Sequence, residues 1–145
     1  MNILISACLY GQKCRYDGNG EMNAMVMDCS NKHTFVPVCP EILGGMNTPR
    51  NPCEIVEGKV KTAEGEDYTS FFVEGALKTL QVAMDKKCQY AILKDKSPSC
   101  GFGKIYDGTF SRKLIDGNGI TANLLASKGI KVIPSSELEE FLGAL

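Results

Sequence analysis

Seven cysteines stand out in this chain of 145 residues, because thiols bind soft metals and act as nucleophiles. We recognise no export signal, and an odd number of cysteines then indicates thiols that stay reduced, so we expect a cytoplasmic protein. The common zinc-finger and zinc-ribbon patterns are missing, since no CxxC pair occurs and His33 is the single histidine. Any metal site must therefore combine cysteines that are distant in the sequence.

Three of these cysteines follow predicted strands. Cys8 comes after the apolar segment 2–6, Cys39 after 35–38, and Cys100 lies in the loop after 90–93. Loops that leave the carboxyl ends of parallel strands converge on one crevice, where ligands bind. Three thiolates without a histidine suit soft metals, and such separated positions favour a bulky cluster over a compact tetrahedral ion. Three ligands on a four-iron cluster also leave one iron open, as a catalytic metal requires.

The other four cysteines carry a weaker signal. Cys14 lies six residues after Cys8 and is either a spare ligand or a simple thiol. Cys88 lies beside the end of a predicted helix, where a buried cysteine behaves as a small hydrophobic residue. Cys29 and Cys53 lie in loops without a matching partner.

The elements that would position the cysteines alternate along the chain. Strands are predicted at 2–6, 35–38, 90–93 and 130–133, and helices at 23–28, 119–128, 137–142 and from a capping Thr69 to Lys87. This alternation predicts an α/β fold, a single domain over residues 1–145 with a Rossmann-like, mostly parallel sheet and helices on both faces. Small peripheral hairpins are predicted at 54–60 and 104–114, and residues 44–52, rich in Gly and Pro, are predicted to form a functional loop.

Several short segments, taken in order, resemble the thiouracil desulfurase family, long catalogued as a domain of unknown function. The resemblance extends nearly from end to end, and the ordered set is specific although each segment alone is weak. The segments are Ser6-Ala7-Cys8-Leu9, Cys14-Arg15-Tyr16-Asp17-Gly18, Pro37-Val38-Cys39-Pro40-Glu41, Gly44-Gly45, Thr48-Pro49-Arg50, Ser97-Pro98-Ser99-Cys100-Gly101 and Ile105-Tyr106-Asp107-Gly108-Thr109-Phe110.

The resemblance implies a 4Fe-4S cluster that is held by Cys8, Cys39 and Cys100 and has one iron without a protein ligand. These are the three cysteines that follow the predicted strands. It further implies a desulfidase, an enzyme that cleaves the carbon–sulfur bond of a thiolated nucleobase or similar small thiocarbonyl compound without net redox change and releases sulfide. The protein must then supply the proton transfer.

Two residues near the cysteines are the predicted catalytic groups. Glu41 lies two residues after Cys39, where a carboxylate can activate water or move its proton. A glutamate here could also be a surface residue or cap a helix. Ser97 and Ser99 precede Cys100, and either hydroxyl could reach substrate or cluster, or serve an ordinary turn. The resemblance favours Ser97 for catalysis and leaves Ser99 for substrate binding.

Four further residues are predicted to bind substrate. Arg15, Tyr16 and Asp17 suit a planar heterocycle, because guanidinium stacking and paired hydrogen bonds recognise such rings, but a structural ion pair would use the same types. Arg50 belongs to the predicted functional loop, where it either contacts substrate or extends into solvent.

Composition limits the partners. The formal net charge is -1, without the basic surplus that binding to polymeric nucleic acid requires, and no apolar segment approaches the roughly 20 residues that cross a bilayer. We expect a small thiolated molecule as the partner, and a monomer or weak homodimer. Two alternatives stay open: a non-catalytic metal- or sulfur-carrying module that uses the same cysteines, and an enzyme with Cys100 as its nucleophile.

Overall fold

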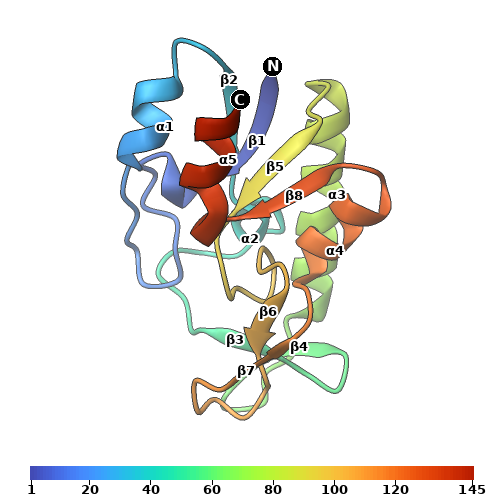
Figure 1. The fold of residues 1–145 in the computed structure, drawn as a ribbon. Coiled ribbons are helices and arrows are strands. Elements are labelled where there is room, and N and C mark those ends of the chain that lie inside the picture. Colours follow the sequence, from blue (N-terminus) through green and yellow to red (C-terminus); the bar gives the residue numbers. More distant parts are fainter.

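Four parallel strands form the central sheet, in the order β2-β1-β5-β8 (Figure 1). They are β1 (Asn2–Ser6), β2 (Thr34–Val38), β5 (Tyr90–Leu93) and β8 (Lys131–Pro134), in a computed structural model that describes residues 1–145. Within the sheet, Ile3 of β1 lies opposite Phe35 of β2 on one side and Tyr90 of β5 on the other. The predicted parallel sheet is therefore confirmed, and the strand ends differ from the predicted ones by at most one residue.

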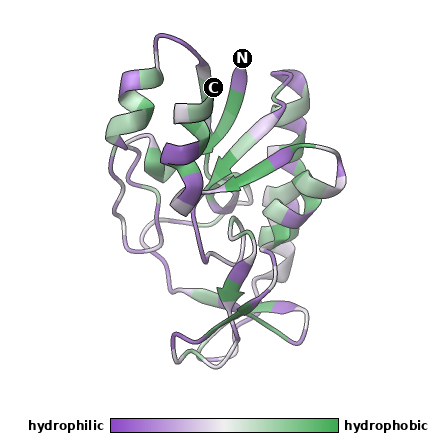
Figure 2. Ribbon diagram, in the orientation of Figure 1, coloured by the Kyte–Doolittle hydropathy of each residue, from purple (hydrophilic) through white to green (hydrophobic).

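Helices cover both faces of the sheet, which explains why its strands are continuously apolar. On one face, Leu4 of β1 packs in a core shared with α3 (Thr69–Asp85) and α4 (Ile120–Ser127). On the other face, Ile3 and Ile92 pack in a core shared with α1 (Ala24–Cys29) and α5 (Leu138–Ala144). Figure 2 shows the central strands as mainly hydrophobic. The predicted α/β fold with helices on both faces is confirmed.

The helix starts follow local capping, with one correction. Asn23 caps α1, because its side-chain oxygen accepts two backbone N–H groups of the first turn. Thr69 was predicted to cap α3, but it is the first helical residue, and Asp67 Oδ1 accepts its N–H at 2.8 Å. The Thr69 hydroxyl instead accepts the N–H of Val60. None of the helices combines the length and apolar character needed to cross a membrane.

Two short helical segments that the sequence did not predict follow β1 and β2 directly. A 3-10 turn, η1, covers Ala7–Leu9, and α2 covers Pro40–Leu43; a second 3-10 turn, η2 (Ser135–Glu137), precedes α5. Helix α2 lies very close to α3, since a Cβ atom on Gly75 would come within 1.9 Å of the Pro40 carbonyl oxygen. A glycine at this position of α3 therefore allows α2 to pack where it does.

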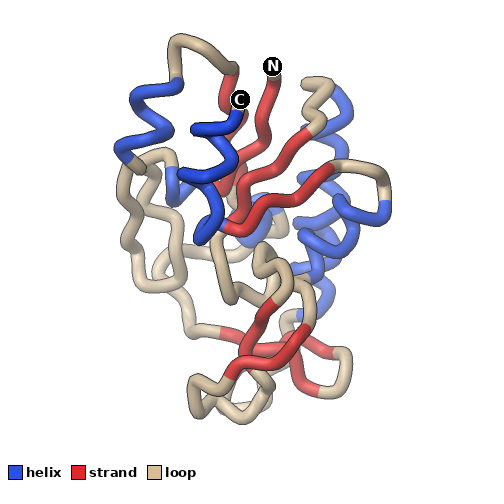
Figure 3. The backbone as a smooth tube through the Cα atoms, in the orientation of Figure 1, coloured by secondary structure: helices blue, strands red, loops and turns tan.

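Two small antiparallel hairpins lie beyond the carboxyl ends of the sheet strands (Figure 3). One consists of β3 (Cys53–Val56) and β4 (Lys59–Thr62), and the other of β6 (Lys104–Tyr106) and β7 (Leu114–Asp116). The Glu54 carboxylate connects them, because Oε1 accepts the N–H groups of Gly108 and Phe110 at 3.0 and 3.2 Å. The predicted hairpins are thus confirmed, and they lie beyond the strand ends that precede Cys8, Cys39 and Cys100.

Candidate functional site

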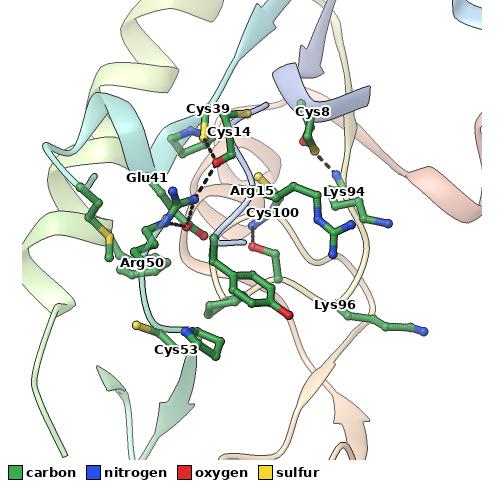
Figure 4. Close-up of a pocket in the computed structure, with 18 of the residues that line it drawn as sticks. Cys8, Cys14, Arg15, Cys39, Glu41, Arg50, Cys53, Lys94, Lys96 and Cys100 are labelled. Atoms are coloured by element: carbon green, nitrogen blue, oxygen red, sulfur yellow. Dashed lines mark hydrogen bonds and ion pairs between the residues drawn. The ribbon is translucent and has the colours of Figure 1, made fainter. Parts of the chain in front are cut away.

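The carboxyl ends of the strands open into one cavity of about 470 Å³. Five of the seven free cysteines line it: Cys8, Cys14, Cys39, Cys53 and Cys100. Figure 4 shows them around the cavity together with Glu41 and Arg50. The structure therefore brings the three strand-end cysteines together, as the parallel-sheet argument predicts.

Each strand-end cysteine is held by a short structured turn. Cys8 lies in η1, which begins directly after Ser6. The Ser6 hydroxyl accepts the N–H of Lys94 at 2.8 Å and so connects the ends of β1 and β5. Cys39 is the N-cap of α2, and Pro40 occupies the first helical position, where its missing N–H costs nothing. The close packing of α2 on α3 fixes the start of that helix.

The turn that carries Cys100 is organised by Ser97. Its hydroxyl oxygen accepts the N–H groups of Ser99 and Cys100 at 3.0 and 3.1 Å, and its carbonyl accepts the N–H of Gly101 at 2.8 Å. Ser97 lines the cavity. The Ser99 hydroxyl is buried and lies 2.8 Å from the hydroxyl of Thr121 in α4, so it faces away from the cavity.

Glu41 is locked beside the cysteines by Arg50. Both Nε and Nη2 of Arg50 contact Glu41 Oε2, at 2.7 and 2.5 Å, and the two side chains are only 8% and 15% exposed. Oε1 of Glu41 has no hydrogen bond to the protein and is not a buried unpaired atom. The fixed carboxylate thus keeps one oxygen free for a water molecule or a substrate.

Arg50 also joins three segments of the site. Its Nη2 donates to the carbonyl oxygen of Cys14 at 2.9 Å, and Nη1 donates to Asn47 O and Thr48 Oγ1. Its backbone N–H donates to Tyr16 O at 2.7 Å. The irregular segment 44–52 is therefore connected to both α2 and the loop after β1.

Of the residues predicted to bind a heterocycle, Arg15 and Tyr16 line the cavity. Asp17 does not, because its carboxylate lies at the surface and accepts the N–H of Asn19 at 3.0 Å. That hydrogen bond lowers the pKa of Asp17, with a smaller contribution from Arg15. Asp17 therefore shapes the loop that presents its two neighbours.

The thiols differ in how easily they ionise. A hydrogen bond from the Cys14 thiol lowers the pKa of Cys39 to about 7 and also lowers the pKa of Cys8. The same contacts raise the pKa of Cys14. Burial raises the pKa of Cys100, and it raises the pKa of Cys53 to about 11. The thiolate form, which binds metal, is thus favoured in Cys8 and Cys39 and disfavoured by burial in Cys100.

The donor set fits an iron-sulfur cluster. No three His, Cys, Asp or Glu side chains converge as the ligands of one metal ion do. The cysteines of such a cluster bind different irons, so their sulfurs stand apart around it. Cys8, Cys39 and Cys100 line the same cavity, and Cys39 and Cys8 add a small contribution to the raised pKa of the buried Cys100. Their thiols are the ligand type that iron-sulfur clusters use.

The sequence prediction missed several cavity residues. They come from the loop after β5 and from the hairpins, and they are Glu54, Lys94, Lys96, Tyr106, Phe110 and Arg112. The resemblance included the segment 105–110 without giving it a role. The sequence did contain a sign that the loop after β5 contributes charged residues to the cavity, since two lysines lie between β5 and Cys100.

Comparisons with known proteins find a family, a sequence relative and a solved structure that are similar to this chain. Residues 3–137 match the family described as 2-thiouracil desulfurase. The uncharacterized protein YbbK of Bacillus subtilis (strain 168) is 45% identical over 150 residues, which cover 97% of this chain and 99% of the relative. The solved structure of the 4Fe-4S-dependent thiouracil desulfidase TudS is similar with a TM-score of 0.92 and 37% identity, covering 99% of this chain and 96% of that one.

Proposed function

Since this chain belongs to the 2-thiouracil desulfurase family, we propose that it removes the sulfur of a thiolated nucleobase or similar small thiocarbonyl compound as sulfide, in a 4Fe-4S-dependent reaction. The family resemblance that the sequence motifs carry is confirmed. One observation supports the reaction most strongly: cysteines from three separate strand ends and a fixed carboxylate meet in one cavity. That arrangement combines ligands for a cluster with a group that handles protons.

Cys8, Cys39 and Cys100 are the proposed ligands, and in this proposal one iron has no protein ligand. When bound, such a cluster supplies a Lewis acid for the sulfur of the substrate. A hydrolytic exchange of sulfur for oxygen needs no electron donor, because carbon keeps its oxidation state. The protein then has to position the substrate and a water molecule and to move protons.

Glu41 is the proposed catalytic residue for proton transfer. Arg50 holds its Oε2, which fixes the carboxylate in the cavity that the cysteines also line and leaves Oε1 without a protein partner. A carboxylate within hydrogen-bond reach can take the proton of an attacking water and later return it to the leaving sulfur. Arg50 acts as a positioning residue, since its donors are already engaged by the protein.

Ser97 is the second proposed catalytic residue. Its oxygen accepts two backbone N–H groups, which leaves its own hydroxyl proton free to donate into the cavity. Arg15 and Tyr16 offer a guanidinium plane and an aromatic face for the heterocycle. Ser99 and Asp17 support substrate binding indirectly, because they fix the turns that carry these groups.

The proposal includes the cellular setting. Iron-sulfur ligands and seven free cysteines need reducing conditions, and the cytoplasm provides them. The partner we propose is a small thiolated molecule, since the cavity is the size of a small-molecule site. We propose that the protein works as a monomer or weak homodimer.

The test is turnover of 2-thiouracil by protein reconstituted with iron and sulfide in the absence of oxygen. Uracil and sulfide should form in equal amounts without an added reductant. Glu41→Gln keeps the shape of the side chain and should lower kcat by about 100-fold or more, the usual contribution of a general acid-base. Glu54→Gln is the matched control, because that carboxylate also lines the cavity but is engaged by the hairpin.

Two results would overturn the proposal. Sulfide release that requires an added reductant would mean a redox reaction. Binding of zinc in place of iron, with no sulfide from any thiolated base, would instead make the protein a metal- or sulfur-carrying module.

A further inference from the structure

Three aromatic side chains take no part in the packing of the molecule. Tyr16, Tyr106 and Phe110 belong to none of the hydrophobic core clusters and to none of the aromatic pairs. Every other phenylalanine and tyrosine of the chain packs in a core or in such a pair. All three unpaired aromatic residues line the cavity. The rings that the fold does not use are therefore those that a ligand in the cavity can meet.

Phe110 also has an unusual backbone conformation. Its φ angle is 58°, in the left-handed region, which is uncommon for a bulky residue. Five non-glycine residues have a positive φ, and three of them line the cavity: Lys96, Phe110 and Arg112. A turn alone would take a glycine at such a position without strain. Strained positions of this kind gather at functional sites, so a phenylalanine here indicates a role for its ring.

The backbone of Phe110 is fixed by the first hairpin. Glu54 Oε1 accepts its N–H at 3.2 Å and the N–H of Gly108 at 3.0 Å, and a glutamine at position 54 would keep this acceptor. Gly108 lies so close to β3 that a Cβ atom there would come within 2.7 Å of the Ile55 carbonyl oxygen. Phe110 itself is half-buried. Main-chain contacts thus hold Phe110 at the cavity, while its ring has no aromatic neighbour.

We propose that Phe110 is a specificity-determining residue whose ring stacks on the face of the heterocycle, and that it selects planar thiocarbonyl rings over saturated ones. This inference rests on the proposed function, because it concerns the substrate of that site. An aromatic side chain stacks on any base that presents a π face, whatever groups the base carries at its edge. Recognition of the ring is thereby separate from the removal of its sulfur.

The first test measures binding without turnover. The chain contains no tryptophan, so Phe110→Trp introduces a single tryptophan that keeps a flat aromatic ring at the cavity. Cluster-containing protein is titrated without oxygen with uracil, which has the ring but no sulfur to remove. Dihydrouracil is the matched ligand, since it carries the same oxygens on a puckered ring. Phe141→Trp is the matched control, because Phe141 packs on Tyr90 outside the cavity.

We expect uracil to quench the tryptophan fluorescence of Phe110→Trp to a saturating level and to leave Phe141→Trp unchanged. Dihydrouracil should bind Phe110→Trp at least about fivefold more weakly, which is the lower limit of what stacking on one aromatic side chain contributes. Equal quenching in the two variants, or equal affinity for the two ligands, would overturn the proposal. Because uracil contains no sulfur, a protein that binds it as expected but releases no sulfide from 2-thiouracil would refute only the proposed reaction.

Kinetics of a second variant give an independent check. Phe110→Leu keeps an apolar side chain but has no π face, so KM for 2-thiouracil should rise by about tenfold while kcat stays within about twofold of wild type. Phe110→Tyr should restore KM, and KM for dihydro-2-thiouracil should be the same in wild type and Phe110→Leu. An equal rise in KM for both substrates would mean that Phe110 only supports the hairpin, and an unchanged KM for 2-thiouracil would mean that its ring does not touch the substrate; either result contradicts the proposal.

Discussion

The ion pair between Arg50 and Glu41 provides the sharpest quantitative prediction. In Arg50→Ala, a carboxylate that is 15% exposed loses its counter-charge, and the carbonyl oxygen of Cys14 loses its donor. Removing one partner of a buried pair costs about 3–5 kcal/mol. Because Glu41 keeps some contact with solvent, we expect the lower end of this range, about 3 kcal/mol. At about 2–4 °C per kcal/mol, the melting temperature should fall by about 6–12 °C.

The same variant should lose activity beyond its loss of stability. Displacement of a catalytic group by about 1 Å can cost about 100-fold in rate, so kcat should fall by about that factor at a temperature where the protein is still folded. Arg50→Lys keeps the charge but lacks the planar fork that reaches Glu41 and Cys14 together. It should therefore rescue stability in part and kcat less.

The assay combines thermal unfolding and sulfide release, both on cluster-containing protein without oxygen. Lys78→Ala is the matched control, because it removes an ion pair whose side chains are more than half exposed, worth no more than about 1 kcal/mol. Wild-type kcat in Arg50→Lys, together with an unchanged melting temperature in Arg50→Ala, would refute the role given to this pair.

Two further predictions concern the packing and the thiols. Gly75→Ala places a methyl group 1.9 Å from the Pro40 carbonyl oxygen, so it should push α2 from α3, cost about 2–3 kcal/mol of stability and reduce sulfide release. Gly143→Ala in α5 is the control and should leave stability unchanged. Equal melting temperatures of the two variants would show that α2 tolerates the shift. In cluster-free protein, Cys39 should react with iodoacetamide increasingly as the pH rises through about 7, whereas Cys53, with a pKa of about 11, should stay largely unmodified at pH 8; mapping by mass spectrometry checks this, and faster modification of Cys53 would contradict it.

The sequence was sufficient for the sheet, because buried parallel strands are short apolar runs with clear ends. The segment 2–6 and its partners have this form, and the cysteines that follow them meet as predicted. Helix α2 was missed, since it has four residues and begins with a proline that also suits a turn. The start of α3 was misplaced by one residue, because Thr69 is a capping type, whereas the N-cap position is held by Tyr68 and the Thr69 N–H is accepted by Asp67.

The finer geometry of the site depends on contacts that sequence patterns do not encode. The Glu54 carboxylate bonds to backbone groups more than fifty residues away, which places the second hairpin over the cavity. Ser99 and Ser97 are both plausible from spacing alone, and only packing against Thr121 shows that the Ser99 hydroxyl points away. The role of Arg50 likewise follows from where its fork points, since an arginine in a flexible-looking loop is equally suited to solvent.

The most direct test of the central claim is iron content and sulfide release in single cysteine variants. Cys8→Ala, Cys39→Ala and Cys100→Ala should each fall well below the roughly four irons per chain of a complete cluster and release no sulfide from 2-thiouracil. Cys88 lies in the core between the sheet and helices α3 and α4, so Cys88→Ala should behave as wild type in both measurements. Full iron and normal sulfide release in any one of the three strand-end variants would contradict the assignment of that cysteine as a ligand and with it the site described above.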